Sequence, residues 1–223
     1  VSEGVTLNQP QAIYMSDAGT VVFSQWDSRL LFRVTESTPQ VIDTVVDLSE
    51  ALGVKARILR IVQRRDKSYL ILTDSPEQLM HFASDWTDPH VIAKGGSGKG
   101  KLYGSTACAE LPAGRLVVTG NGNYPVQFFD NSGRFLTAAD WNNPVPQGGW
   151  IGSALAVDQR ERIWVADLTK SVFRRYDLTG TSIDILPFSS PVARPVDMAV
   201  TSDNQLFVLN DTGRLDMYDL GQE

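Results

Sequence analysis

One pattern, two short apolar segments separated by a polar turn, returns five times along this chain of 223 residues. The positions that align between the copies are Phe23, Leu72, Val118, Val165 and Val208. Their spacings are 49, 46, 47 and 43 residues. An aromatic residue follows each aligned position after 9 to 11 residues, in the order Phe32, Phe82, Phe129, Tyr176 and Tyr218. A period of about 40 to 50 residues with several short strands in each copy indicates a blade of four antiparallel strands.

We therefore expect an all-β chain, a β-propeller of five blades that forms a single domain over residues 1–223. The expected blades cover residues 10–46, 54–94, 103–141, 150–188 and 195–223. The last copy ends after its third strand, whereas residues 4–7 precede the first copy. Pairing of residues 4–7 with the last strand would complete the fifth blade and leave no unpaired edge strand. The alternative is a fragment of a six- or seven-bladed propeller.

Two local signals accompany the repeat. Small residues precede each copy, as at residues 154–157, which suits inner strands that converge on a central channel. One helical turn is expected over residues 47–53, where Asp47 or Ser49 would cap its start and Gly53 would end it.

The clearest copies resemble a known repeat family. Ile163-Trp164-Val165-Ala166-Asp167, the stretch from Val172 to Gly180, and Val126-Gln127-Phe128-Phe129-Asp130-Asn131-Ser132-Gly133 are similar to NHL-type repeats of six-bladed propellers. The resemblance covers residues 103–221 well and residues 1–100 poorly. It implies propeller architecture and leaves activity open, because propellers host many functions.

Composition excludes several function classes. A formal charge of −6 and a pI near 5.0 argue against nucleic-acid binding. The apolar runs are far shorter than the roughly 20 residues of a membrane-spanning helix, so no membrane insertion is expected. The single cysteine, Cys108, excludes an intrachain disulfide and favours a packing role. The start at Val1 favours a processed or extracytoplasmic domain of a larger polypeptide.

Catalytic groups in a propeller would lie at the inner-strand ends that line the channel mouth. The residues expected there are Gln11, Arg57, Thr106, Ser153 and Asp197. Only Asp197 is a carboxylate, whereas calcium takes about six or more oxygen ligands and a glycosidase needs two carboxylates. His81 and His90 are expected toward the rim, away from a zinc position. No cofactor or metal is therefore expected, and the alternative is a hydrolase or lyase with a metal- or carboxylate-based site at the channel mouth.

Two segments that contain basic residues are considered for anion binding as the alternative to a structural role. Residues 95–101 have the spacing of a phosphate-binding loop, but Leu102 replaces the required Ser or Thr and a strand should follow, which favours a flexible connection. Residues 55–67 hold six of the 20 basic residues, which suits either an ordinary strand and hairpin or an anionic partner.

Aromatic residues in the expected connections carry the functional prediction. Trp164 lies inside a strand and is expected in the core, whereas Trp26, Tyr124, Trp141 and Trp150 fall in connections that should share one face. Exposed aromatic rings there would bind a protein, peptide or glycan; alternatively, they fill gaps between blades. We predict a non-enzymatic binding or scaffolding domain. Its predicted ligand-binding residues are Trp26, Arg57, Tyr124, Trp141, Trp150 and Asp197.

Overall fold

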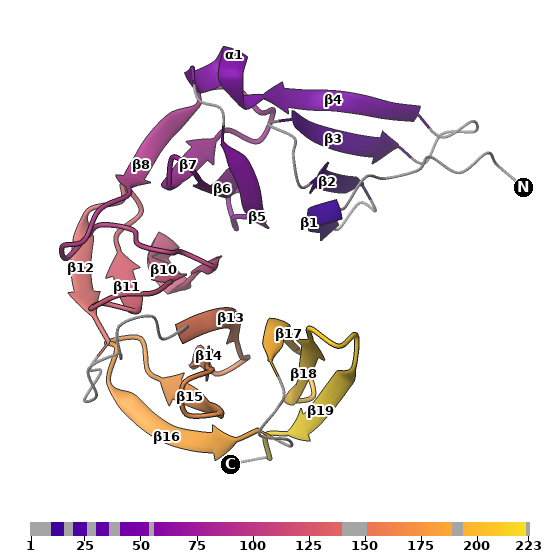
Figure 1. Cartoon of the computed structure of the whole chain (residues 1–223). Helices are drawn as coiled ribbons and strands as arrows, with labels where there is room; N and C mark the ends of the chain where they lie inside the picture. Colours follow the sequence, from indigo (N-terminus) through magenta and orange to yellow (C-terminus); the bar gives the residue numbers. More distant parts are fainter. Residues whose placement is uncertain are drawn as a thin grey trace, which may run out of the picture. The chain divides into compact units, whose positions relative to one another are not determined.

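The computed structural model describes residues 10–15, 20–25, 30–35, 41–53, 56–139, 151–188 and 194–221. The chain forms two compact units, Val1–Gly95 and Gly96–Glu223. The first unit contains two antiparallel sheets and the second contains three (Figure 1). Within every sheet the strands follow one another in chain order, so each strand pairs with the next.

The first unit is built from eight described strands and one short helix. Its first sheet contains β1 (Pro10–Met15), β2 (Val21–Gln25), β3 (Leu30–Thr35) and β4 (Val41–Asp47). Its second sheet contains β5 (Arg57–Gln63), β6 (Tyr69–Asp74), β7 (Gln78–Phe82) and β8 (His90–Lys94). Ala12, Val22 and Leu31 of the first sheet share one core with Ile61 and Phe82 of the second. The two sheets of this unit therefore stabilise each other by burying apolar side chains between them.

The expected helical turn is present as α1 (Leu48–Leu52), between β4 and β5 (Figure 1). The Asp47 side chain caps it by accepting a hydrogen bond from the backbone N–H of Ser49, and Gly53 ends it with φ of 67°. Both caps are local to the sequence, which is why this element could be predicted without the rest of the fold.

The second unit contains eleven described strands and one 3₁₀ turn. Its first sheet contains β9 (Ala107–Glu110), β10 (Leu116–Thr119), β11 (Val126–Phe129) and β12 (Phe135–Ala138), and the 3₁₀ turn η1 (Pro112–Gly114) connects β9 to β10. Its second sheet contains β13 (Ile151–Val157), β14 (Ile163–Asp167), β15 (Val172–Tyr176) and β16 (Ser182–Pro187). Its third sheet contains β17 (Pro195–Val200), β18 (Gln205–Asn210) and β19 (Leu215–Asp219).

Strand β14 of the middle sheet is buried on both faces. Ile163 and Val165 of β14 belong to a core shared with Phe128 of the preceding sheet. Trp164, between them, packs instead into a core shared with Leu206 of the following sheet. Alternate residues of a strand point to opposite faces, so β14 serves two interfaces at once and every residue in it is buried. The prediction that Trp164 is a core residue is confirmed.

The all-β expectation and the four-stranded antiparallel sheet as the repeating element are confirmed. All five aligned positions of the repeat lie in the second strands of their sheets and are buried: Phe23, Leu72, Val118, Val165 and Val208. Among the described residues, β19 is the last strand of its sheet, and Leu215 and Met217 on it are exposed. Residues 4–7, the predicted fourth strand, lie outside the described residues, so that pairing stays a prediction.

The aromatic partners have the same register in the last three copies and a different one in the first two. Phe129, Tyr176 and Tyr218 each lie opposite the residue two positions before the aligned one. Phe32 instead lies directly opposite Phe23, and Phe82 lies opposite Tyr69, three positions before Leu72. The first two copies thus depart from the register of the last three in the same part of the chain, residues 1–100, where the repeat signal is weaker.

No helix in the described ranges has the length and apolar character needed to cross a bilayer.

Candidate ligand-binding surface

The predicted ligand-binding residues lie in different parts of the chain, and some lie outside the described residues. Trp26, Trp141 and Trp150 lie outside the described residues. Arg57 begins β5 in the first unit and forms an ion pair with Asp74, its partner across the β5–β6 pairing. The guanidinium of Arg57 is therefore already engaged within its own sheet.

The other two predicted residues belong to the second unit. Asp197 is exposed on β17, and its Oδ1 accepts a hydrogen bond of 3.0 Å from the backbone N–H of Met198. Tyr124 is half-buried in the connection between β10 and β11. Tyr124 lies in a surface that two segments of the second unit build.

That surface is formed by two segments, residues 96–106 and 120–125, which we call the loop pair. Thr119 at the end of β10 pairs with Ala107 at the start of β9. The antiparallel pairing therefore brings the segment that leads into β9 and the segment that leaves β10 to the same end of the sheet.

Close backbone packing joins the two segments. The backbone N–H of Asn121 donates a hydrogen bond of 2.8 Å to the carbonyl of Tyr103. A Cβ atom placed on Gly120 would lie 2.7 Å from that same carbonyl oxygen, so only glycine permits this approach. The ring of Tyr103 lies beside Gly122, where an added Cβ would be 3.0 Å from Cδ1 of the ring. The backbone of Tyr103 is thus held by the 120–125 segment.

A buried glutamine holds the rest of residues 96–106. Gln127 of β11 accepts a hydrogen bond of 2.8 Å from the N–H of Gly100 and donates one of 2.7 Å to the carbonyl of Lys101. The N–H of Gly96 also donates to the carbonyl of Leu102, which is itself buried. The segment expected to be a flexible connection therefore makes defined contacts along its length.

These contacts also bear on the phosphate-loop alternative. A phosphate-binding loop needs several backbone N–H groups that point at the anion. Here the N–H groups of Gly96, Gly100 and Lys101 all donate within the protein. The segment is followed by strand β9, as expected, and its amide groups do not form a phosphate cradle.

The side chains that the loop pair presents are aromatic and cationic. Tyr103 is 57% exposed, and in the described part of the chain no other Phe, Trp or Tyr side chain is exposed. The ammonium of Lys99 lies 5.6 Å from the centre of the Tyr124 ring, within the range of a cation–π contact. Sequence reasoning found Tyr124 and missed Tyr103, and it considered Lys99 and Lys101 only within the phosphate-loop alternative. The signal that could have found Tyr103 is its place beside Gly104 in a connection, off the apolar alternation of the strands.

Two described carboxylates that end the second strands of their sheets are engaged within those sheets. Asp74 pairs with Arg57, and Asp167, which is buried, accepts from Nε of Arg174 at 2.8 Å. Asp167 also accepts from the backbone N–H groups of the β14–β15 connection and so fixes that turn. Within the described ranges, no three His, Cys, Asp or Glu side chains are grouped as metal ligands would be.

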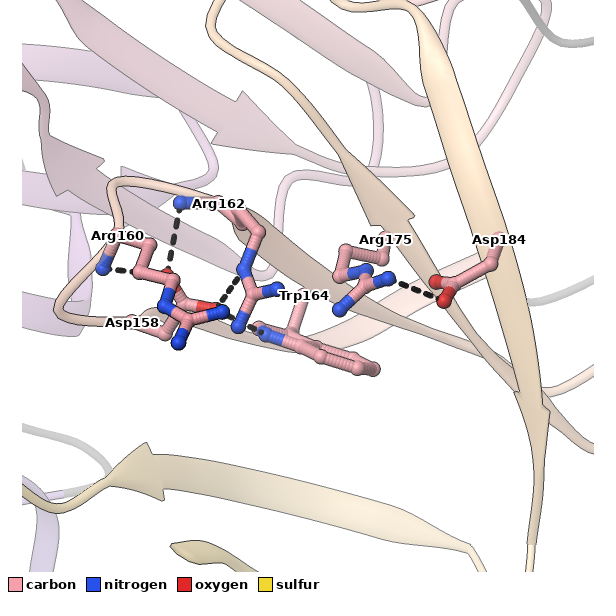
Figure 2. A network of polar contacts seen from close by, with 6 residues as sticks. All are labelled: Asp158, Arg160, Arg162, Trp164, Arg175 and Asp184. Atoms are coloured by element: carbon pink, nitrogen blue, oxygen red, sulfur yellow. Dashed lines mark hydrogen bonds and ion pairs between the residues drawn. The ribbon is translucent and has the colours of Figure 1, made fainter. Parts of the chain in front are cut away.

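A more connected polar network lies on the turn between β13 and β14 (Figure 2). Asp158 accepts from the backbone N–H groups of Arg160 and Arg162, from Nε of Arg162 at 2.7 Å and from Nε1 of Trp164 at 3.0 Å. Arg175 lies over the Trp164 ring at 5.3 Å and pairs with Asp184 of β16. Burial alone would raise the pKa of Asp158, but the hydrogen bonds from Trp164 and Arg162 hold it below its usual range. The Asp158 carboxylate therefore accepts from four donors, and this network stabilises the β13–β14 turn and the sheet.

The two histidines form a pair that the sequence did not indicate. His81 of β7 lies directly opposite His90 of β8, and their ring centres are 4.7 Å apart. Burial lowers the pKa of His81, and His90 and Arg64 act in the same direction. The buried Nδ1 of His81 has no hydrogen-bond partner in the described structure.

Cys108 is buried in β9 between two alanines, in keeping with the expected packing role.

Comparison with known proteins shows the fold of this chain and does not show its function. No family model matches the chain, and no curated protein matches it in sequence. A structure of a streptogramin B lyase matches 99% of this chain and 72% of its own, with a TM-score of 0.74 at 14% identity. Virginiamycin B lyase from Staphylococcus aureus matches 96% of this chain and 71% of its own, with a TM-score of 0.71 at 13% identity.

A structure of a nidogen/laminin complex gives a similar match. It covers 95% of this chain and 76% of that chain, with a TM-score of 0.71 at 12% identity. These similar structures are β-propellers that include both enzymes and a protein complex. At such low identity the likeness shows architecture alone, and on that ground this chain has a β-propeller fold.

Proposed function

We propose that this chain is a binding domain that recognises a peptide segment of a partner protein at the loop pair. The observation that carries the proposal is the exposed ring of Tyr103 on a backbone fixed by Asn121 and Gly120. An exposed tyrosine on a pre-ordered loop offers a large contact area at little further cost in conformational entropy.

Two further points support a protein or peptide partner. Tyrosine is over-represented among the residues that dominate protein–protein binding energies. The similar structures include a nidogen/laminin complex, which is an assembly of proteins. The NHL-type resemblance of residues 103–221 and the predicted binding roles of Trp141, Trp150 and Asp197 stay predictions. The predicted roles of Trp26 and Arg57, which belong to the first unit, stay separate predictions and are no part of the loop pair.

A selection experiment tests the proposal. A phage-displayed library of random linear peptides is panned against the full chain, and the selected clones are tested on variants. Tyr103→Ala should weaken their binding by about 1 kcal/mol or more, which is roughly fivefold in Kd. Ile183→Ala removes an apolar side chain of similar exposure from the outer strand β16 and should leave binding unchanged.

The outcome of this experiment either supports or overturns the proposed binding function. Clones that lose binding on Tyr103→Ala and keep it on Ile183→Ala, with both variants melting like the wild type, support the proposal. An absence of selectable clones, or clones indifferent to Tyr103→Ala, overturns it.

A further inference from the structure

We propose that the loop pair takes an acidic peptide segment, with a carboxylate beside Lys99 and Lys101 and a neighbouring apolar side chain on the ring of Tyr103. This inference rests on the proposed function and gives the chemistry of its ligand. It is carried by the charge of the loop pair, by the position of that charge, and by the ring beside it.

The charge of the loop pair is opposite to that of the chain. The sequence has 26 acidic and 20 basic residues, whereas the segment of residues 96–106 holds two lysines and no acidic residue. Many described arginines form ion pairs with carboxylates: Arg33, Arg57, Arg134, Arg162, Arg174, Arg175 and Arg214. Lys99 and Lys101 are both exposed, and among the described residues no carboxylate forms an ion pair with either. Two ammonium groups are therefore available to an incoming anion.

The positions of these lysines are partly fixed. The ring of Tyr124 attracts the Lys99 ammonium by a cation–π contact and keeps it at the loop pair. A contact with the ring face leaves other N–H groups of the ammonium able to donate to a carboxylate. Gln127 holds the carbonyl of Lys101, so the backbone that carries the second lysine is fixed as well. Hydrogen bonds to a charged acceptor are about twice as strong as neutral ones, so carboxylate binding here is favoured.

An exposed ring follows the two lysines in the same short segment. Tyr103 lies two residues after Lys101 and four after Lys99, and its ring is accessible to an apolar side chain. A ligand that satisfies both features carries an anionic group next to an aromatic or aliphatic one. An acidic peptide segment meets this requirement with adjacent side chains.

A nucleic acid fits less well. Binding to a phosphate backbone draws its affinity from several lysines and arginines that neutralise successive phosphates. The loop pair offers two cations on a chain of net charge −6, which would repel a long polyanion. A short acidic segment needs only the local charge.

The experiment uses one peptide from a selected clone and its matched neutral form, in which each Asp and Glu is changed to Asn and Gln. Fluorescence anisotropy measures binding of both peptides to the full chain. The variants are Lys99→Gln and Lys101→Gln, with Arg160→Gln as the control that removes an exposed cation from the β13–β14 turn. Measurements at low and at physiological salt separate the charge contribution, because exposed charges are screened over about 8 Å at physiological ionic strength.

The expected result is enrichment of Asp and Glu in the selected clones and a loss of about fivefold in affinity for the neutral peptide. Lys99→Gln and Lys101→Gln should weaken the acidic peptide and leave the neutral one unchanged, and Arg160→Gln should change neither. Clones that depend on Tyr103 but show no acidic enrichment overturn this inference and leave the proposed function intact. Clones that do not depend on Tyr103 overturn both.

Discussion

Trp164 donates its indole N–H to Oδ2 of Asp158 across 3.0 Å, and this bond joins the β13–β14 turn to the core between two sheets of the second unit (Figure 2). The ring of Trp164 packs with Met198 and Leu206 of the neighbouring sheet. Since Asp158 also pairs with Arg162, one buried carboxylate satisfies donors from both the turn and the interface.

The first prediction concerns that carboxylate. Asp158→Asn replaces one acceptor oxygen with an NH₂ group that faces donors, and it leaves the half-buried Arg162 without its counter-charge. Breaking a buried, hydrogen-bonded pair typically costs about 3 to 5 kcal/mol, so we expect a fall of about 3 kcal/mol in the free energy of unfolding. Urea denaturation followed by circular dichroism measures this free energy.

A matched turn provides the control. Asp130 makes the same kind of turn between β11 and β12, where it accepts from Ser132 and from Nε of Arg134 at 3.1 Å. The hydrogen bond from Ser132 and the others lower the pKa of Asp130 to about 2, but Arg134 is largely exposed. Asp130→Asn should therefore change stability much less than Asp158→Asn. Equal losses in the two variants would contradict the role given to burial.

The second prediction is a pH dependence that originates at His81. Burial lowers its pKa from 6.5, and His90 and Arg64 lower it further, against the opposite effect of Asp66 and Asp88. As the pH falls, the unfolded chain takes up the proton first. The stability contributed by neutral His81 is therefore complete above about pH 6.5 and is lost as the pH falls toward the lower folded-state pKa. Urea denaturation at a series of pH values measures this loss.

Two variants separate the causes of that loss. His81→Gln removes the titrating group and should flatten the profile over this pH range. His90→Gln leaves His81 buried and should reduce the slope without abolishing it, because burial is the larger cause of the shift. A wild-type slope in His81→Gln would assign the pH dependence to other groups.

How far the sequence predicted the fold depended on how local each signal was. The helical turn at residues 47–53 was predicted because its caps are neighbours in the chain. The blades were predicted because Val118, Val165 and Val208 fill equivalent buried positions at a regular spacing. The helix caps depend on consecutive residues and the blades depend on periodically spaced residues, so both can be recognised in the sequence alone.

The candidate site depended on contacts that no periodicity records. Tyr103 is held because Gly120 and Asn121, from another connection, lie against its backbone. Similarly, His81 and His90 meet only through the register between β7 and β8. Composition and spacing leave such pairings undetermined, and the predicted set of aromatic residues therefore included Tyr124 but not Tyr103.

The third prediction tests the tryptophans that the sequence assigned to the ligand-binding face. Trp141→Ala and Trp150→Ala should each weaken binding of the selected peptides by more than about 1 kcal/mol, with little change in melting temperature. A large aromatic ring that contacts a ligand contributes to the complex alone, whereas a ring between blades contributes to the fold. Loss of melting temperature without loss of peptide affinity would assign these rings to the fold.

The fourth prediction links the order of the loop pair to binding. In Gly120→Ala the new Cβ would lie 2.7 Å from the carbonyl oxygen of Tyr103 and 3.0 Å from Cα of Ser105, so backbone must move. Forcing a methyl group into packed backbone typically costs about 1 to 3 kcal/mol, and it should displace Tyr103 from Asn121. We expect a lower melting temperature and a weaker affinity for the selected peptides.

Gly98→Ala is the matched control for that variant. Gly98 belongs to the same pair of segments, but an added Cβ there meets nothing within 4 Å. The same change of side chain should therefore leave both melting temperature and peptide affinity at wild-type values. If Gly98→Ala weakened the peptide as much as Gly120→Ala does, the effect would come from loss of glycine in the loop pair in general, and the specific contact between Gly120 and Tyr103 would not be what orders the binding surface.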